Sequence, residues 1–283
     1  MSLTEIEMYK TLVDLKKNHN VKGLKLSFED EGTLSEEAQV FMRIAARADL
    51  PVSIKIGGCE AKKDMYDAAV LGAAKIVGPM VETPYALQKF VQATHSTLTE
   101  NQRKSINFYI NCETITGCNN IEAMLSTPEA KELSGIVLGR VDLIGSLGLT
   151  REDINSDQVF QIANRVATAT KANNMDLLMG GAVSTASMPF FKKLPQNSLK
   201  AFETRNVIFD AEKALEDKNI ELGLAKAMYF ELKWLEHKKE NYGRLSSRDD
   251  KRIDMMTRRY NDTMNKINAS AGNFIGLAAN SGR

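Results

Sequence analysis

The feature that most constrains the fold of this chain is a repeated alternation of short apolar runs with longer stretches of helical periodicity. The apolar runs predict strands at residues 23–29, 52–58, 74–80, 105–113, 135–140, 176–181 and 201–208. The stretches between them predict helices at residues 34–48, 61–71, 84–96, 117–126, 156–173 and 187–194. This order is typical of parallel strands joined by helical crossovers.

The spacing of these runs favours an α/β fold of the closed (β/α)8 TIM-type barrel class. Successive strands start roughly 25 to 40 residues apart, and no Gly-rich dinucleotide fingerprint follows the first one. Only seven strands are predicted. An eighth could lie within residues 1–22, although that segment has a helical pattern, and a flavodoxin-like open sheet is the alternative fold.

The pattern changes to long helices near the C-terminus. We therefore expect a barrel domain over residues 1–220 and a C-terminal helical extension of the same domain over residues 221–283. In the extension, Ile253, Met256, Tyr260, Met264 and Ile267 recur at helical spacing. Such a stripe is either ordinary core packing or a contact between subunits.

Composition argues against partners that recognise bulk charge. The 37 Lys and Arg nearly balance the 36 Asp and Glu, so we expect no binding to nucleic acid or to a membrane surface. The three cysteines show no paired spacing, which suits a reducing compartment. The N-terminus does not resemble a signal peptide and no apolar run is long enough to cross a bilayer, so a cytoplasmic protein is expected.

Period-two alternation assigns charged residues to the inside of the predicted barrel. In the run 105–113, Ile106, Phe108 and Ile110 form the apolar face, while the other face carries polar residues and ends at Glu113. The same alternation turns Lys25, Lys55, Glu203 and Arg205 inward. Because buried ions are costly unless they pair or meet a ligand, this set predicts an active site. An internal salt-bridge network that fixes the strand register is the alternative.

Two acidic residues end neighbouring predicted strands and could hold a divalent cation. Glu113 ends one strand, and Asp142 follows the next in "GIVLGRVDLIG". Carboxylates at adjacent strand ends of a barrel suit a hard cation such as Mg²⁺ or Mn²⁺. Asp142 could instead cap a turn.

Three segments together resemble the pyruvate-type class II aldolase and citrate lyase β-subunit superfamily of phosphoenolpyruvate/pyruvate-domain barrels. They are "INCETITGCNNIEAML", "LSGIVLGRVDLIGSLGL" and "AAVLGAAKIVGPMVETPYALQKFV", within residues 23 to 150. The resemblance implies a metal-dependent carbon–carbon lyase or aldolase that acts on a 2-keto acid or acyl-CoA-like thioester through a Mg-bound enolate. It also implies a homo-oligomer.

The resemblance implies roles for individual residues. Glu113 and Asp142 match the family's two metal-binding carboxylates, and Lys55 stands where the family usually has an Arg. We expect Lys55 and Arg140 to neutralise the charge of the substrate, with Arg140 or Arg205 supplying the guanidinium that Lys55 lacks. The family's acid/base His is missing from "SFEDEGT", so Glu29 or Glu31 is the expected proton carrier, with Asp30 or metal-bound water as alternatives. The residues expected to contact the substrate are Lys25, Arg205, Gly139 and Met80.

Three further interpretations stay open at this stage. Lys55 or Lys25 could act as a Schiff-base nucleophile, because a desolvated lysine can lose its proton and attack a carbonyl. The barrel could instead be non-catalytic and keep only ligand or metal binding. The segment "MGGAVSTASMPFF" could hold an anion beside Gly180 and Gly181, or could be a loop with Ser184 or Ser187 as an ordinary helix cap.

Overall fold

A computed structural model describes the backbone of residues 1–280 and the side chains of residues 1–265. The chain divides into two compact units, Met1–Trp234 and Leu235–Arg283. The first unit holds every strand and reaches past residue 220, so residues 221–234 belong with the barrel. The second unit is helical.

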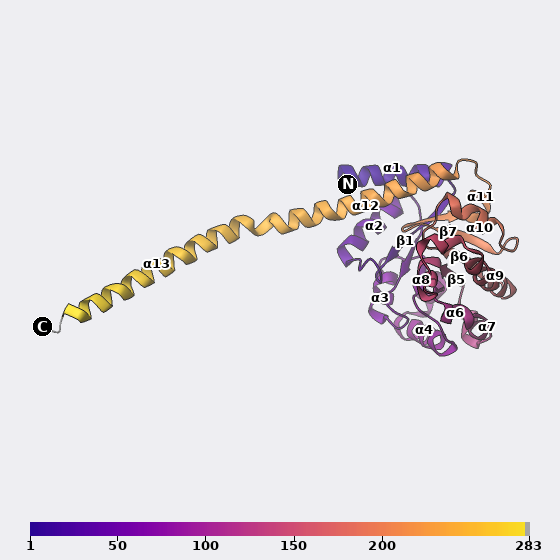
Figure 1. Cartoon of the computed structure of the whole chain (residues 1–283), viewed down its shortest axis with the longest axis horizontal. Helices are drawn as coiled ribbons and strands as arrows, with labels where there is room; N and C mark the ends of the chain where they lie inside the picture. Colours follow the sequence, from indigo (N-terminus) through magenta and orange to yellow (C-terminus); the bar gives the residue numbers. More distant parts are fainter. Residues whose placement is uncertain (281–283) are drawn as a thin grey trace. The chain divides into compact units, whose positions relative to one another are not determined.

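The first unit alternates strands with helices (Figure 1). Its strands are β1 (Val21–Ser27), β2 (Val52–Lys55), β3 (Lys75–Gly78), β4 (Asn107–Cys112), β5 (Gly135–Gly139), β6 (Asp176–Gly180), β7 (Leu199–Glu203) and β8 (Val207–Asp210). Its helices are α1 (Leu3–Asn18), α2 (Ser35–Arg47), α3 (Lys62–Val70), α4 (Pro84–Thr97), α5 (Glu100–Ser105), α6 (Ile115–Asn119), α7 (Ile121–Leu125), α8 (Arg140–Ser146), α9 (Asp157–Ala172), α10 (Met188–Lys192) and α11 (Ala211–Ala214). Short 3₁₀ turns are η1 (Pro128–Glu132), η2 (Arg151–Asn155) and η3 (Thr185–Ser187).

The strands close into a barrel in the order β1 to β8, which confirms the predicted barrel and excludes the open sheet. Strands β1 to β7 run parallel to one another. Their carboxyl ends therefore meet at one rim of the barrel. Active sites of such barrels form at this rim.

The eighth strand lies where a single seventh strand was expected. The predicted run 201–208 is divided into β7 and β8, and β8 pairs antiparallel with both β7 and β1. Residues 1–22, the predicted alternative, form α1 instead. A short turn at 204–206 therefore closes the barrel without a helical crossover.

Apolar residues fill two separate cores. The larger core packs the outer face of the strands against the surrounding helices. The smaller one consists of residues that alternate onto the inner face of their strands, Val77, Tyr109, Val137, Leu178, Ala201 and Ile208. The inner core fills the barrel below the rim that the carboxyl ends of the parallel strands form.

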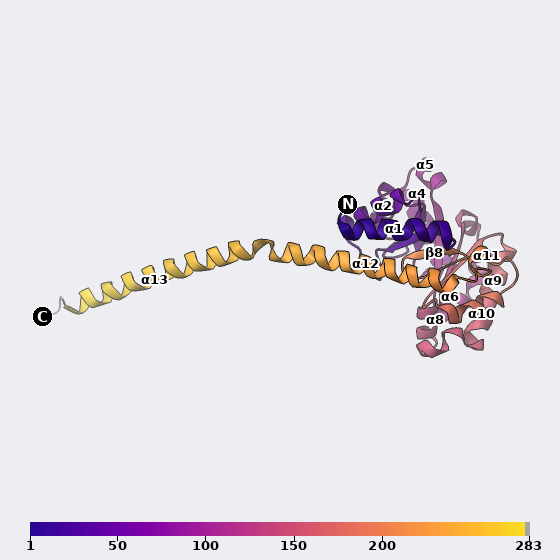
Figure 2. The same cartoon turned by 90° about the horizontal axis from the view of Figure 1, so that it is seen from above.

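The helix that follows the barrel, α12 (Ile220–Ser246), begins in the first unit. Lys226 Nζ donates to Asp14 Oδ2 at 2.5 Å, and Tyr229 OH donates to Glu7 at 3.4 Å. These contacts place the start of α12 alongside α1, as Figure 2 also shows. Within the described residues, no helix is both long and apolar enough to span a bilayer.

Candidate active site at the barrel mouth

A cavity of about 630 Å³ opens at the rim formed by the carboxyl ends of the parallel strands. Strand ends, the segments that follow them and the start of α12 line it. The lining residues that carry charge are Lys25, Asp30, Lys55, Glu113, Asp142, Arg151, Glu203, Arg205, Glu221 and Glu231. The predicted convergence of polar side chains from several strands is therefore present.

Glu113 lies at the centre of one group of these side chains. It directly follows β4, and its side chain is 2% exposed. Asn111 Nδ2 donates to Glu113 Oε2 at 2.6 Å, and Lys55 Nζ lies 3.3 Å from both carboxylate oxygens. Lys55 Nζ also lies 2.8 Å from Glu29 Oε2. One ammonium thus bridges two carboxylates.

The environment of Glu113 makes its negative charge costly. Burial raises the pKa of Glu113, and the charge of Asp142 raises it further, against the opposing effects of Lys55 and Asn111. Asp142 lies in the first turn of α8 and lines the same cavity. A cation between the two carboxylates would relieve this cost.

Gly139 leaves the space that the Glu113 carboxylate occupies. A Cβ atom at Gly139 would lie 2.8 Å from Glu113 Oε2 and 2.9 Å from Glu113 Cβ. Any larger residue would displace the carboxylate. Gly139 therefore shapes the site in addition to lining it.

A second charged pair lies on another part of the rim. Lys25 in β1 donates from Nζ to Glu203 Oε1 in β7 at 2.7 Å. A Cβ atom at Gly180 would lie 3.2 Å from Glu203 Oε1, so this glycine leaves room for the second carboxylate. Lys25 and Glu203 both line the mouth cavity.

Arg140 does not lie where a substrate guanidinium is needed. Its residue is fully buried and is not among the residues that line the cavity. Its guanidinium donates to the carbonyl oxygens of Gly180 and Gly181, at 3.3 and 2.9 Å. It also donates to Asn155 Oδ1 at 2.7 Å and Ser187 Oγ at 3.1 Å. In this structure the guanidinium is thus held by groups of the chain itself.

The candidate anion-binding segment serves the same network. Its carbonyls and Ser187 accept hydrogen bonds from Arg140, and Ser184 N–H donates to Ser187 Oγ at 3.3 Å. The rings of Phe190 and Phe191 lie 5.2 and 4.9 Å from the guanidinium carbon. The segment holds a cation of the chain itself.

Of the other residues predicted to contact the substrate or carry a proton, only some line the cavity. Glu29 and Glu31 do not line the cavity, because Glu29 faces Lys55 and Glu31 accepts from Arg205 Nη1 at 3.2 Å. Arg205 does line it, from the turn between β7 and β8. Met80 does not, since it is 45% exposed after β3 and has a φ of 50°.

Sequence reasoning missed the lining residues that lie outside the strands. Arg151 begins η2, and Leu224, Ala225 and Met228 come from α12. Strand alternation carries no information about them. Their place at the mouth depends on how α8, η2 and α12 pack, which requires the three-dimensional fold.

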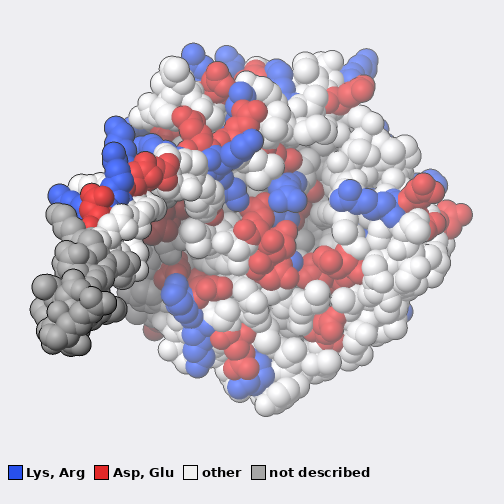
Figure 3. All heavy atoms as spheres, turned by 60° about the vertical axis from the view of Figure 1, so that its left-hand side comes forward, with Lys and Arg blue, Asp and Glu red and all other residues white. Residues whose placement is uncertain are grey.

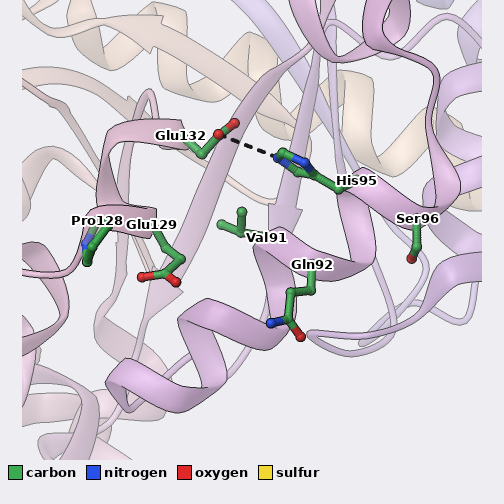
Figure 4. A pocket seen from close by; sticks show the side chains of 7 residues that line it. All are labelled: Val91, Gln92, His95, Ser96, Pro128, Glu129 and Glu132. Carbon is green, nitrogen blue, oxygen red and sulfur yellow. Dashed lines mark ion pairs between the residues drawn. The ribbon is translucent and has the colours of Figure 1, made fainter.

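A second cavity of about 530 Å³ lies away from the mouth, between α4 and η1 (Figure 4). The residues that line it are Val91, Gln92, His95, Ser96, Pro128, Glu129 and Glu132. Its one ion pair joins His95 Nε2 and Glu132 Oε1 at 3.5 Å. No strand end contributes to this lining, so we place the candidate active site at the mouth.

The residues at the mouth fit a divalent cation that keeps most of its positions for other ligands. Glu113 Oε1 is buried and accepts no hydrogen bond from the described residues, although Lys55 Nζ lies 3.3 Å away, and the charge of Asp142 acts on this carboxylate. In the described part of the chain, no cluster of three or more His, Cys, Asp or Glu side chains could hold a metal. Two carboxylates with open positions suit Mg²⁺, which retains waters and often binds through one or two acids.

The closed barrel and its charged mouth define a TIM-type barrel protein with a cavity at the carboxyl ends of the strands, where the active sites of such barrels form. The model of the HpcH/HpaI aldolase/citrate lyase family matches residues 44–188. The chain belongs to this family, whose members are carbon–carbon lyases, aldolases and related synthases. The match contains Lys55, Glu113 and Asp142.

Solved structures share the fold at low sequence identity. An HpcH/HpaI aldolase/citrate lyase family protein from Burkholderia cenocepacia J2315 is 17% identical, with a TM-score of 0.58 over 81% of this chain and 92% of that chain. The citrate synthase SbnG is 16% identical, with a TM-score of 0.56 over 78% of this chain and 89% of that chain. Macrophomate synthase is 15% identical, with a TM-score of 0.53 over 84% and 90%. A search of curated proteins gave no match.

Proposed function

We propose that this protein makes or breaks a carbon–carbon bond next to the keto group of a 2-keto acid or beside an acyl thioester, and that it requires Mg²⁺ or a similar cation. The observation that carries the proposal is the convergence of Glu113 and Asp142 on one cavity beside the Lys55 ammonium. Bond cleavage leaves negative charge on the substrate. Cationic groups that are already fixed at the site stabilise such charge.

The residues of the chain divide this work between them. Glu113 and Asp142 would hold the cation, which when bound would polarise the substrate oxygen and stabilise negative charge on it. Lys55 would attract the substrate carboxylate, held in place by Glu29 on its other side. Lysine offers a point charge without the fork of an arginine, so it fixes the carboxylate less strictly in orientation.

The Schiff-base alternative is less well supported. Burial alone would lower the pKa of Lys55, but the charge of Glu113 and the contacts of Glu29 and Glu113 leave it raised. The pKa of Lys25 is likewise raised, because Glu203 outweighs burial. A Schiff-base lysine must be neutral to attack a carbonyl. Borohydride trapping with pyruvate would reveal such an adduct, and a trapped adduct with full activity in EDTA would favour this alternative.

The test of the proposal is titration calorimetry with Mg²⁺ and oxalate, which stands in for the enolate of pyruvate. We expect the wild-type protein to bind oxalate only with Mg²⁺ present, and Glu113→Gln and Asp142→Asn to weaken this binding by at least about 10-fold. Glu129→Gln is the matched control, because Glu129 lines the other cavity. Turnover of oxaloacetate or a 4-hydroxy-2-keto acid would separate a catalyst from a barrel that only binds.

Wild-type binding that is independent of Mg²⁺, or variants that bind normally, would reject the cation site. Binding without turnover of either substrate would favour the non-catalytic alternative.

A further inference from the structure

Cleavage of a carbon–carbon bond beside a keto group leaves an electron pair on carbon that must receive a proton. No histidine is among the described residues that line the mouth cavity. Glu29 and Glu31, the acids expected from the sequence, lie outside the lining. Asp30 does line it, but its pKa is lowered: burial alone would raise it, and Ser27, Lys25 and Lys55 outweigh burial. Asp30 is therefore ionised and has no proton to give at neutral pH.

Lys25 is a better placed donor. Its side chain is 23% exposed and lines the cavity. Its Nζ donates to Glu203 Oε1 at 2.7 Å, and within the described part of the chain this is its one hydrogen bond. An ammonium has three N–H groups. Two of them therefore remain for a ligand in the cavity.

The backbone of Lys25 is held firmly. Its N–H donates to Asn206 O at 2.8 Å, and Asn206 Nδ2 donates to Lys25 O at 3.0 Å. Asn206 is 1% exposed. Lys25 is thus held at its backbone by Asn206 and at Nζ by Glu203.

Lys55 is less suited to the same task. Its ammonium faces Glu29 and both oxygens of Glu113, and its side chain is 9% exposed. Its N–H groups are directed toward carboxylates of the chain. Lys55 supplies charge, whereas Lys25 has hydrogens available.

We propose that Lys25 is the general acid that protonates the substrate carbon after bond cleavage, with Glu203 as its positioning residue; this rests on the function proposed above. The electron pair on the carbon forms the new C–H bond. The N–H bond of Lys25 breaks and its nitrogen keeps that pair as a neutral amine. Water at the mouth then returns a proton to the amine. In the reverse direction the amine removes the proton.

The charged groups around Lys25 support this role. Glu203 and Asp30 raise the pKa of Lys25, whereas burial and the neighbouring Lys55 lower it, and the net direction is upward. Lys25 is therefore charged at neutral pH and carries the proton that the proposed step uses. Loss of the Glu203 charge would lower the pKa of Lys25.

The experiment measures exchange of the methyl protons of pyruvate in D₂O by NMR, in the full-length protein with Mg²⁺, at alkaline pH, where part of Lys25 is the neutral amine that removes a proton. We expect Lys25→Met and Lys25→Arg to slow the exchange by about 10²-fold or more. Arginine keeps the charge but does not release a proton, so it separates acid/base chemistry from attraction. Lys200→Met is the matched control, because Lys200 is exposed on the same strand as Glu203 and does not line the cavity.

Glu203→Gln tests the positioning role through the pH profile. Proton removal from pyruvate needs the neutral amine, so exchange rises with pH. The lower pKa of Lys25 in this variant should move the rising limb to lower pH. If the substitution changes only the maximal exchange rate and the rising limb of the pH profile stays at the same pH, the proposed role of Glu203 is wrong.

The two proposals fail in different ways. If wild-type protein neither binds oxalate with Mg²⁺ nor exchanges pyruvate protons, the proposed function is wrong and this inference falls with it. If wild-type protein exchanges protons and Lys25→Arg exchanges them at the same rate, Lys25 is not the acid and the proposed function stands. Oxalate affinity within about threefold of that of the wild-type protein would show that the variants keep an intact binding site.

Discussion

Arg140 is a single buried residue that supports the wall of the mouth cavity. Its guanidinium fastens β6 and the segment after it to η2 through four hydrogen bonds. Burial lowers its pKa to about 10, so it stays charged at neutral pH. Because Gly180 and Gly181 also line the mouth, Arg140 supports the cavity wall from behind.

We therefore predict that Arg140→Met lowers the free energy of unfolding by about 2–4 kcal/mol, since it leaves several buried acceptors without a donor. Urea unfolding followed by circular dichroism measures this. Arg151→Met is the control, because Arg151 is exposed at the mouth, and its change should stay within about 0.5 kcal/mol. If Arg140→Met keeps its stability but no longer binds oxalate, the prediction is wrong and Arg140 contacts the substrate.

Gly139 offers a test of how tightly the Glu113 carboxylate is confined. Its replacement by Ala would place a Cβ atom 2.8 Å from Glu113 Oε2, so Glu113 must move. We predict that Gly139→Ala weakens oxalate binding with Mg²⁺ by at least about 10-fold, because misplaced ligands lose affinity. Calorimetry measures this.

Gly145→Ala is the matched control for that change. It lies in α8, and a Cβ atom there meets nothing within 4 Å. Alanine is favoured over glycine in helices by up to about 1 kcal/mol, so this variant should bind normally and melt slightly higher. Equal binding by both alanine variants would show that Glu113 adjusts freely.

The inner residues at the strand ends could be predicted from the sequence, whereas side chains after the strands could not. Alternation placed Lys25, Lys55, Glu113 and Glu203 in the cavity, because the backbone of a strand fixes which face each side chain takes. This alternation ends where the strand ends. Arg140 lies in the first turn of α8 and is buried, and Met80 has a positive φ and is exposed.

The element that sequence patterns could not resolve is the hairpin of β7 and β8. The run "AFETRNVI" has no glycine or proline in its middle, and Asn206 alone is of a turn-favouring type, so the sequence marks the turn only weakly. The turn is held by side chains from far along the sequence. Thr204 Oγ1 and Asn206 N–H both donate to Glu231 Oε1 in α12, at 2.6 and 2.9 Å.

We predict that Glu231→Ala lowers the free energy of unfolding by about 1–3 kcal/mol, because it leaves the buried Asn206 N–H without its acceptor and removes one acceptor of Thr204 Oγ1. Asn206 also holds the backbone of Lys25, so pyruvate exchange should slow as well. Glu240→Ala is the control, since Glu240 is an exposed residue of the same helix and does not line the cavity. Thermal and urea unfolding measure stability, and equal losses in both variants would mean that α12 contributes only its helical backbone.

At the scale of the whole molecule, the surface carries charge of both signs. On the face in Figure 3, acidic and basic side chains are interspersed. The net charge of the sequence is also close to zero, so no large region of one sign is expected. Contacts of this protein with large partners must therefore depend on local features.

The second unit provides such a feature. Its helices are the end of α12 and α13 (Asp250–Asn280), joined by η4 (Ser247–Asp249). The large apolar side chains at Leu235, Tyr242, Leu245, Ile253, Met256 and Tyr260 are exposed. Met264 is partly exposed, and the side chain of Ile267, the last of the predicted stripe, lies outside the described residues.

Exposed apolar side chains that recur along a long helix are typical of a surface that packs against a partner. A long helix gains most of its stability from packing an apolar face. Residues 235–265 contain eight basic and six acidic residues. Flanks of mixed sign complement another copy of themselves better than they complement a strongly charged surface. We therefore propose that the protein self-associates through its C-terminal helices.

Two neighbouring methionines give a matched test of this proposal. Met256 continues the stripe of Ile253 and Tyr260, whereas Met255 points to another face because successive helical residues differ by about 100°. We predict that Met256→Glu shifts the protein to a smaller species in light scattering at micromolar concentration, because a charge in the contact is costly to desolvate. Met255→Glu should leave the mass unchanged. A wild-type protein that is monomeric at these concentrations, or equal effects of both substitutions, would show that a different partner covers the stripe.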